Sequence, residues 1–178
     1  MLHDFGQPLG GVVQFAYVVE DLDRSMAEFT KELGAGPWFV RGPFQPTAGR
    51  YRGNPTSAEF SLARGFSGHV MIELIQQHDD SPSVFNEGDG DRRLGFHHWA
   101  RLTQDFEGDL ERYLQAGFVE AFSDRVASGA RVAYMEPTGE LPGMIELVEQ
   151  TPEQERAYTR FYLASVDWDG SEPVRRED

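Results

Sequence analysis

The sequence contains no cysteine, and this absence excludes several kinds of chemistry at once. Disulfide bonds, thiolate metal sites and cysteine nucleophiles are all ruled out. Any metal ion bound by the protein must therefore be held by histidine, carboxylate or amide oxygen.

Basic residues are also scarce. Sixteen Lys and Arg residues stand against 30 Asp and Glu residues, which gives a net charge of -14. A charge of this sign repels phosphate backbones and anionic membrane surfaces. We therefore expect a small-molecule substrate as the partner, and neither nucleic acid nor a membrane.

Long apolar runs and a targeting signal are missing too. No apolar run approaches the roughly 20 residues that span a bilayer, and the N-terminus MLHDFGQPLGG has neither a basic region nor an apolar core. We expect a cytoplasmic protein. The length of 178 residues, 39% of them hydrophobic, suits one globular domain or two small modules that share a core.

What the sequence does contain is an internal repeat. The run MIELIQQ at residues 71–77 returns as MIELVEQ at residues 144–150. Each copy follows an apolar strand-like run, a helix-patterned segment that stops at glycine, and two short extended runs. The pattern predicts an α+β fold of two βαβββ modules, over residues 12–77 and 95–150.

Three further segments connect or follow these modules. A polar stretch over residues 78–94 is predicted to be a linker, and residues 44–56, rich in Pro, Gly and Asn, are predicted to form a long loop inside the first module. Residues 151–178 are predicted to form a C-terminal helix, with Thr151 as N-cap, and a frayed tail.

A glutamate interrupts each copy of the repeat. Side chains alternate along a strand, so Glu73 shares a face with Met71 and Ile75, and Glu146 is placed in the same way in the second copy. Both faces are otherwise apolar, which is typical of a strand covered on both sides. A lone ionised carboxylate there would cost several kcal/mol, so something must compensate each glutamate.

The first strands of the modules supply candidate partners. If the modules pack as a pseudo-twofold pair, four side chains converge on one cavity: Gln14, Glu73, His98 and Glu146. One imidazole, one amide and two carboxylates suit a divalent cation with open positions for substrate. By strand alternation His97 faces the other way and is interpreted as structural. The alternatives are that the glutamates face solvent, that backbone groups satisfy Gln14, and that His98 is a core histidine.

The region around the long loop offers candidates for substrate contact. Four aromatic side chains could line an apolar pocket, although core packing explains the first two equally well: Trp38, Phe39, Phe44 and Tyr51. Three arginines could meet a substrate anion, although solvated surface positions are commoner for this residue: Arg50, Arg52 and Arg64.

Three runs within residues 12–150 carry a resemblance to a known family: QFAYVVEDLDRSMAEFTKELGAGPW, HHWA after a glycine, and MIELV. On these runs the chain resembles the vicinal-oxygen-chelate (glyoxalase/bleomycin resistance/dioxygenase) superfamily, in its glyoxalase or methylmalonyl-CoA epimerase-like branch. The resemblance implies paired modules in a curved, partly closed mixed sheet around a metal cavity, and a homodimer. It also implies that Gln14, Glu73, His98 and Glu146 bind a divalent metal ion, which would be Zn, Ni, Co, Mn, Fe or Mg.

The resemblance further implies proton transfer next to a carbonyl group, as in an isomerase, epimerase or lyase acting on a small carbonyl-bearing substrate. Glu146 is the preferred base and Glu73 its partner, and the assignment between the two stays open. Two alternatives remain. One is a metal-free ligand-binding or drug-sequestering protein of the same fold, and the other is a non-haem iron ring-cleavage dioxygenase. The dioxygenase pattern needs two histidines, and this sequence offers one suitable histidine, His98.

Overall fold

The computed structural model describes residues 1–86, 94–126 and 128–177. Within these ranges three helices and an eleven-stranded sheet are formed. In chain order the elements are β1 (Gln14–Val18), α1 (Leu22–Leu33), β2 (Trp38–Phe44), β3 (Arg50–Tyr51), β4 (Asn54–Pro55), β5 (Phe60–Ser67), β6 (Val70–Gln77), β7 (Gly95–Thr103), α2 (Phe106–Gln115), β8 (Val119–Arg125), β9 (Arg131–Glu136), β10 (Met144–Glu149), α3 (Pro152–Ser165) and β11 (Val174–Arg176). None of the described helices has the length and apolar character needed to cross a membrane.

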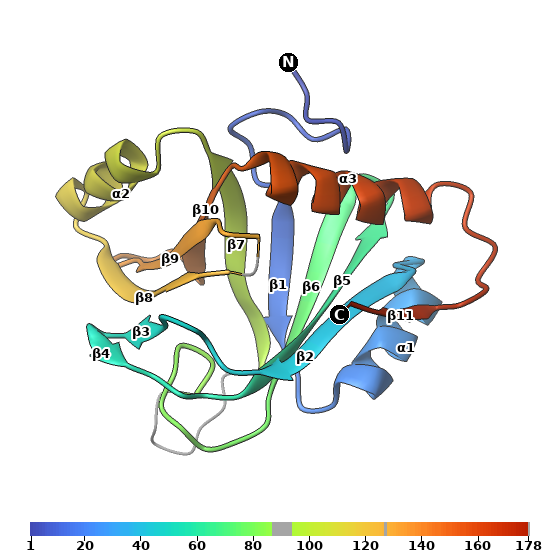
Figure 1. Cartoon of the computed structure of the whole chain (residues 1–178), viewed down its shortest axis with the longest axis horizontal. Helices are drawn as coiled ribbons and strands as arrows, with labels where there is room; N and C mark the ends of the chain where they lie inside the picture. The colour runs from blue at the N-terminus through green and yellow to red at the C-terminus, as the bar shows by residue number, and fades with distance from the viewer. Residues whose placement is uncertain (87–93, 127, 178) are drawn as a thin grey trace.

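The sheet is mixed, curved and open, which confirms the predicted α+β fold with its C-terminal helix (Figure 1). The strands follow the order β11-β2-β5-β6-β1-β7-β10-β9-β8-β3-β4. The two first strands, β1 and β7, meet antiparallel at the centre, and each pairs in parallel with the last strand of its own half, β6 or β10. The order of elements is therefore repeated on either side of the β1–β7 contact, while the module boundaries themselves stay predictions.

Alternating side chains pack on both faces of the sheet, with one large cluster on the concave face and two smaller ones on the outer face, beside α1 and α2. Met71 and Ile75 of β6 belong to the large cluster on the inner, concave face. Ile72 and Leu74 of the same strand pack on the outer face, in the cluster that includes residues of α1. Helix α1 begins at the N-cap Asp21, and it ends where Gly34 adopts a left-handed conformation with φ 63°.

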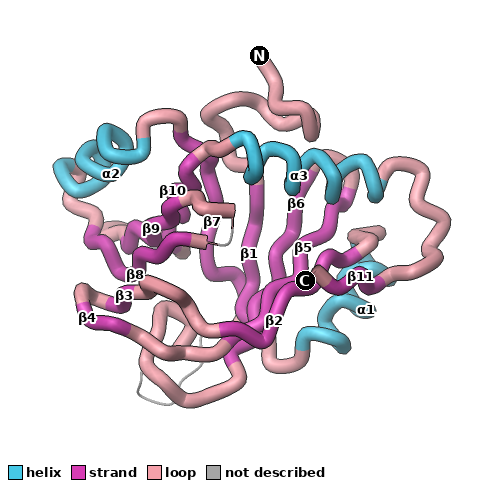
Figure 2. The backbone as a smooth tube through the Cα atoms, viewed as in Figure 1, coloured by secondary structure: helices cyan, strands magenta, loops and turns pink. Residues whose placement is uncertain are grey.

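The segment 44–56 is more than a loop inside the first half. It leaves β2 at one side of the sheet and forms β3 and β4, and β3 pairs with β8 at the other side (Figure 2). Arg50 lies opposite Ser123 in this pairing. The prediction of a long loop missed these two short strands, because the free edge of β8 offers backbone partners that the local sequence does not reveal.

The C-terminal segment is ordered against the sheet. Helix α3 lies across the concave side (Figure 1), with Thr151 as its N-cap as predicted. The tail does not fray, because β11 pairs in parallel with β2 and the Trp38 N–H donates to the Pro173 carbonyl. An edge strand has unpaired backbone N–H and C=O groups that can bond to an extended segment, and β2 offers such an edge to β11.

The segment between the two halves is also partly buried. Val84 and Phe85 are 0% and 2% exposed, and Ser83 and Asn86 are buried too, whereas His78, Asp80 and Pro82 are exposed. Residues 87–93 of the predicted linker lie outside the described ranges.

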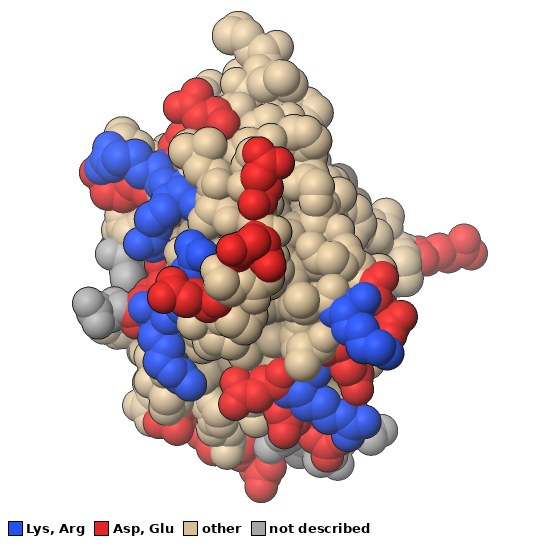
Figure 3. Space-filling model, turned by 90° about the vertical axis from the view of Figure 1, so that its right-hand side faces the viewer, with Lys and Arg blue, Asp and Glu red and all other residues tan. Residues whose placement is uncertain are grey.

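Surface charge is mixed on the face drawn in Figure 3. Acidic side chains lie among arginine and lysine side chains there, and the described basic residues on this face form no continuous patch. The distribution agrees with the excess of acidic residues that gives the net charge of -14.

Candidate metal centre

Four adjacent strands carry the four residues selected from the sequence. Gln14 lies on β1, Glu73 on β6, His98 on β7 and Glu146 on β10, and these strands are neighbours in the order β6-β1-β7-β10. All four side chains point to the concave face, because their strand neighbours at spacing two belong to the inner core cluster. The structure therefore brings the predicted residues together.

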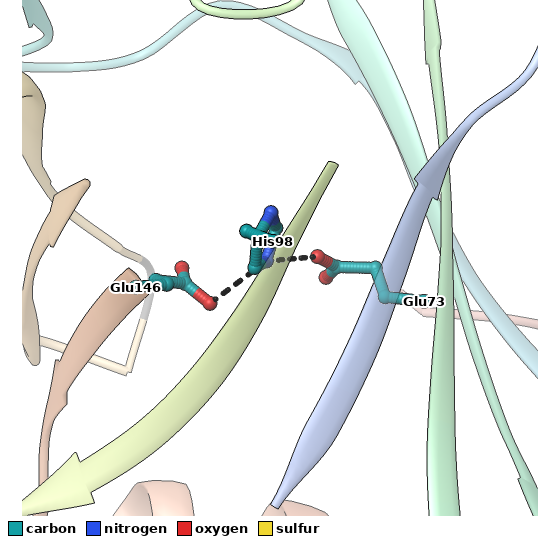
Figure 4. A group of neighbouring side chains, drawn as sticks. All are labelled: Glu73, His98 and Glu146. Atoms are coloured by element: carbon teal, nitrogen blue, oxygen red, sulfur yellow. Dashed lines mark ion pairs between the residues drawn. The ribbon is translucent and has the colours of Figure 1, made fainter. Parts of the chain in front are cut away.

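The group is compact and deeply buried. The ligand atoms of Glu73, His98 and Glu146 all lie within 4.8 Å of one another. His98 Nε2 is 3.3 Å from Glu146 Oε2 and 3.6 Å from Glu73 Oε2, and Figure 4 shows the imidazole between the two carboxylates. Gln14 Nε2 donates to Glu73 Oε2 at 2.9 Å. The exposed fraction is 0% for His98, 1% for Gln14 and Glu73, and 7% for Glu146.

His97 also turns toward this group, so its assignment to the opposite face was wrong. In the β1–β7 pairing Ala16 lies opposite His98 and Tyr17 opposite Phe96, which leaves His97 as the extra residue of a β-bulge. The bulge interrupts the alternation of side chains. As a result His97 Nδ1 lies 2.9 Å from His98 Nδ1.

The hydrogen bonds of His97 set the tautomer of His98. His97 Nε2 lies 2.9 Å from the Val84 carbonyl oxygen, which can only accept, so this nitrogen carries a hydrogen. In a neutral His97 the other nitrogen, Nδ1, is then an acceptor, and it receives the hydrogen of His98 Nδ1. His98 Nε2 is left with a lone pair that faces the carboxylates of Glu73 and Glu146. Burial lowers the pKa of His98 to about 4, which keeps the imidazole neutral.

Arg64, one of the three arginines considered for contact with a substrate anion, is instead bonded to a member of the site. Its cross-strand partner in the β5–β6 pairing is Glu73, and its Nε donates to Glu73 Oε1 at 2.7 Å. The Arg64 side chain is 19% exposed, so the prediction of a solvated surface arginine was wrong. Burial raises the pKa of Glu73, and the Arg64 charge opposes that rise.

Tyr134 takes the corresponding place beside Glu146. It is the cross-strand partner of Glu146 in the β9–β10 pairing, and its ring packs edge-on against the His98 ring at 4.8 Å. Burial raises the pKa of Glu146 to about 7, while the charge of Arg64 and the Tyr134 hydroxyl act in the opposite direction. Within the described residues, a tyrosine thus stands next to one glutamate and an arginine next to the other.

The donor set fits a divalent cation. Gln14 Oε1 is buried and has no hydrogen-bond partner among the described residues, although a buried carbonyl oxygen normally has one. The lone pair of His98 Nε2 faces two carboxylates whose pKa values burial raises. A cation would satisfy the orphaned oxygen, the lone pair and the two acids together. The buried group Glu73, His98 and Glu146 could therefore hold a divalent metal ion.

A cavity of about 220 Å³ lies above this group. Its walls include Phe60, Phe85 and Phe122, and Glu146 and Tyr134 line it as well. Helix α3 contributes Tyr158 and Phe161, which close it on the side away from the sheet. Apolar side chains thus share the walls with charged and polar ones, among them Arg41, Asp124 and Gln154.

The other residues considered from the sequence lie in various places. Phe44 and Arg64 line the cavity. Trp38 is buried in the outer core instead. Arg52 forms an ion pair with Glu136, and Arg50 donates to the Gly53 carbonyl. Sequence reasoning missed Tyr134 and the pairing of Arg64 with Glu73. Both follow from the register of β9 with β10 and of β5 with β6.

Comparison with known proteins identifies the family. Residues 13–134 match the model of the Glyoxalase/Bleomycin resistance protein/Dioxygenase superfamily. The chain belongs to this superfamily, which confirms the resemblance drawn from the sequence. No curated protein matches the chain.

Solved structures agree at the level of the fold. Methylmalonyl-CoA epimerase from Mycobacterium tuberculosis is 19% identical, with 83% of this chain and 93% of that chain covered and a TM-score of 0.55. The Streptomyces coelicolor methylmalonyl-CoA epimerase in complex with 2-nitronate-propionyl-CoA is 16% identical, with 81% and 99% covered and a TM-score of 0.53. A hypothetical protein from Bacillus halodurans is 17% identical, with 79% and 94% covered and a TM-score of 0.54. At these identities the likeness establishes the fold alone.

Proposed function

We propose that this protein is a metal-dependent enzyme that moves a proton at a carbon next to a carbonyl group, as an isomerase, epimerase or lyase. The observation that carries the proposal is the buried group of Glu73, His98 and Glu146 at the floor of a cavity that Glu146 lines. Membership of the superfamily and the epimerase fold of the structural neighbours support it. The proposed substrate is a small carbonyl-bearing molecule.

The proposed metal ligands are Gln14, Glu73, His98 and Glu146, with Zn, Ni, Co, Mn, Fe or Mg as the ion. A divalent metal held there would supply Lewis-acid stabilisation of the negative charge that develops on the substrate carbonyl oxygen. The chain fixes the geometry around it: His97 orients His98, and Gln14 and Arg64 hold Glu73. This restraint favours Glu73 as a stationary ligand.

Glu146 is the proposed base. It lines the cavity, whereas Glu73, with Gln14 and His98, lies beneath the lining. Its carboxylate has a pKa of about 7, so it accepts and returns a proton near neutral pH. The phenylalanine walls exclude water from the carbon that loses the proton. Glu73 is the proposed partner of Glu146, as the stationary metal ligand on the other side of His98.

The two alternatives from the sequence are less well supported. A ring-cleavage dioxygenase needs a second histidine at the ion, but His97 Nδ1 contacts His98, and the described cluster of possible ligands contains His98 as its one histidine. A metal-free binding protein would leave Gln14 Oε1 without a partner. The homodimer and the cytoplasmic location stay predictions.

Two measurements test the proposal. Metal analysis of protein purified without chelator should find about one divalent ion per chain, and His98→Ala should lose it. The protein should also catalyse exchange of α-protons of small carbonyl compounds with deuterated solvent, followed by NMR. Wild-type protein without a divalent ion, or His98→Ala with unaltered metal content, would contradict the proposed centre.

A further inference from the structure

Arg41 is a half-buried cation in the wall of the cavity. It lies on β2, two residues after Phe39 of the inner core, so its side chain points to the concave face. Its guanidinium lies over the Phe44 ring, 4.6 Å from the ring centroid. In the described part of the chain, no hydrogen bond or ion pair is formed by this guanidinium. Its five N–H donors are therefore available to a ligand.

The other charged groups of the cavity are already engaged. Arg64 is bonded to Glu73, and the Arg125 guanidinium donates to the Gly129 carbonyl. Of the acids near Arg41, Asp124 accepts from the Ala48 N–H, and Glu177 forms an ion pair with Arg160. Burial and the neighbouring Arg64 charge lower the pKa of Arg41, and the Glu177 and Asp124 charges offset this only in part, so its cationic form gains from a further anion that reaches it.

An arginine without a partner is unexpected in this composition. The chain has 30 acidic residues for 16 basic ones, so acidic partners are plentiful. The planar fork of a guanidinium matches carboxylate and phosphate, which it binds through two parallel hydrogen bonds. The Arg41 guanidinium faces the cavity, packs on an aromatic ring and donates to no acceptor within the described residues. It is therefore placed to bind the oxyanion of a ligand.

The sheet register gives the distance from Arg41 to the proposed metal centre. Arg41 lies opposite Leu62 on β5, and Glu73 on β6 lies opposite Arg64, two residues farther along β5. The Cα atoms of Arg41 and Glu73 are two strands apart across the sheet and two residues apart along the strands. Combined at right angles, these steps give a distance of roughly 12 Å. Both side chains reach inward from these positions. A molecule of modest length can therefore contact both ends of the cavity.

We propose that Arg41 forms an oxyanion subsite and that the substrate carries a carboxylate or phosphate group in addition to its carbonyl group. The second part rests on the proposed function, because it assumes that the carbonyl end lies at Glu146. The subsite would orient the substrate along the cavity and select for anionic molecules. The guanidinium binds a carboxylate and a phosphate through the same hydrogen bonds, so experiment must decide which of the two anions the subsite prefers.

Binding of simple anions to the full-length protein tests the subsite. Malonate, inorganic phosphate and neutral malonamide are titrated into the protein by calorimetry, first as purified and then with a chelator present. We expect one of the two anions to bind with a stoichiometry of one, and malonamide not to bind. Arg41→Gln should weaken the anion about tenfold, as expected for the loss of a charged hydrogen-bonded pair. Arg41→Lys should recover part of that loss.

Arg125→Gln is the matched control, since Arg125 lines the same cavity but donates to a backbone carbonyl. It should change the affinity less than twofold. Equal anion binding by wild type and Arg41→Gln, an equal loss in Arg125→Gln, or no anion binding by wild type would each overturn the subsite. The chelator series separates this result from the metal proposal, because anion binding that persists in chelator and is weakened by Arg41→Gln needs Arg41 and no metal ion.

Discussion

The two halves of the sheet present the same glutamate in different surroundings. In the first half the cross-strand neighbour of Glu73 is Arg64, and in the second half the neighbour of Glu146 is Tyr134. Glu73 is bonded to Arg64 and to Gln14, and it is 1% exposed. Glu146 has a neutral neighbour and lines the cavity. A single exchange of arginine for tyrosine thus separates a carboxylate paired with a cation from one that lines the cavity, and this difference underlies the proposal of Glu146 as the base.

The largest expected effect comes from removing the charge of each glutamate in turn. Glu146→Gln should slow α-proton exchange by about 10²–10⁴-fold, the usual contribution of a positioned general base. Glu73→Gln should act mainly through weaker metal binding, so added metal should restore much of its activity. Exchange rates measured over a range of metal concentrations distinguish the two variants. A larger rate loss at saturating metal in Glu73→Gln would reverse the assignment.

Removing Arg64 should leave Glu73, like Glu146, without a cationic cross-strand neighbour. Arg64→Met leaves the Glu73 carboxylate buried without its cation, which costs about 3–5 kcal/mol of unfolding free energy at pH 8 in chelator-treated protein. The cost should shrink at pH 5, because the carboxyl group can then be protonated. Urea unfolding at both pH values measures it. Tyr134→Phe is the control for the other half and should cost only about 1 kcal/mol.

The next prediction concerns the hydrogen bond between His97 and the proposed metal ligand His98, both on β7. His97→Phe removes the acceptor of the His98 Nδ1–H and should weaken metal affinity by about 10–100-fold, as is usual for partners of metal-ligating histidines. His97→Gln keeps an acceptor and should recover part of the affinity. Competition with a metal-binding dye measures both. Unchanged affinity in His97→Phe would remove His97 from the site.

The smallest expected effect concerns the ends of the two repeats. Gln76 of the first copy accepts from the Leu22 N–H, whereas Glu149, its counterpart 73 residues farther along the chain, is bonded to Arg131. These bonds lower the pKa of Glu149 to about 2. Its stabilising contribution is therefore complete above pH 4.5, the ordinary value, and is lost as the pH falls toward 2.

Thermal unfolding between pH 6 and pH 2 measures this contribution. Glu149→Gln should flatten the pH dependence over that range, and because Glu149 is partly exposed the change should be small. Gln76→Ala should lower stability equally at every pH, since its hydrogen bond involves no titrating group. An unaltered slope in Glu149→Gln would show that other acids dominate the acid sensitivity.

Much of the fold and of the candidate site could be predicted because both depend on strand alternation. Period-two alternation in the two MIEL runs correctly assigned Glu73 and Glu146 to the inner face. Alternation failed at His97, where a bulge adds one residue to the strand. The roles of Arg64 and Tyr134 depend on which residues lie opposite each other in paired strands, and a single chain segment does not contain that information.

The long-range strand pairs were missed for the same reason. Strand β3 finds its partner in β8, and β11 finds its partner in β2. Both are short segments with little apolar character, so their conformation is decided by a free edge elsewhere in the sheet rather than by their own residues.

The position of α3 and β11 in the chain has a consequence for synthesis of the protein. Both elements follow the two halves of the sheet in the sequence, yet α3 supplies one wall of the cavity and β11 pairs with β2. During translation the sheet can fold from its N-terminal side while these elements are still being made. The cavity therefore stays open on one side during this interval, so the proposed metal ion would have access to Glu73 and His98 before α3 covers them.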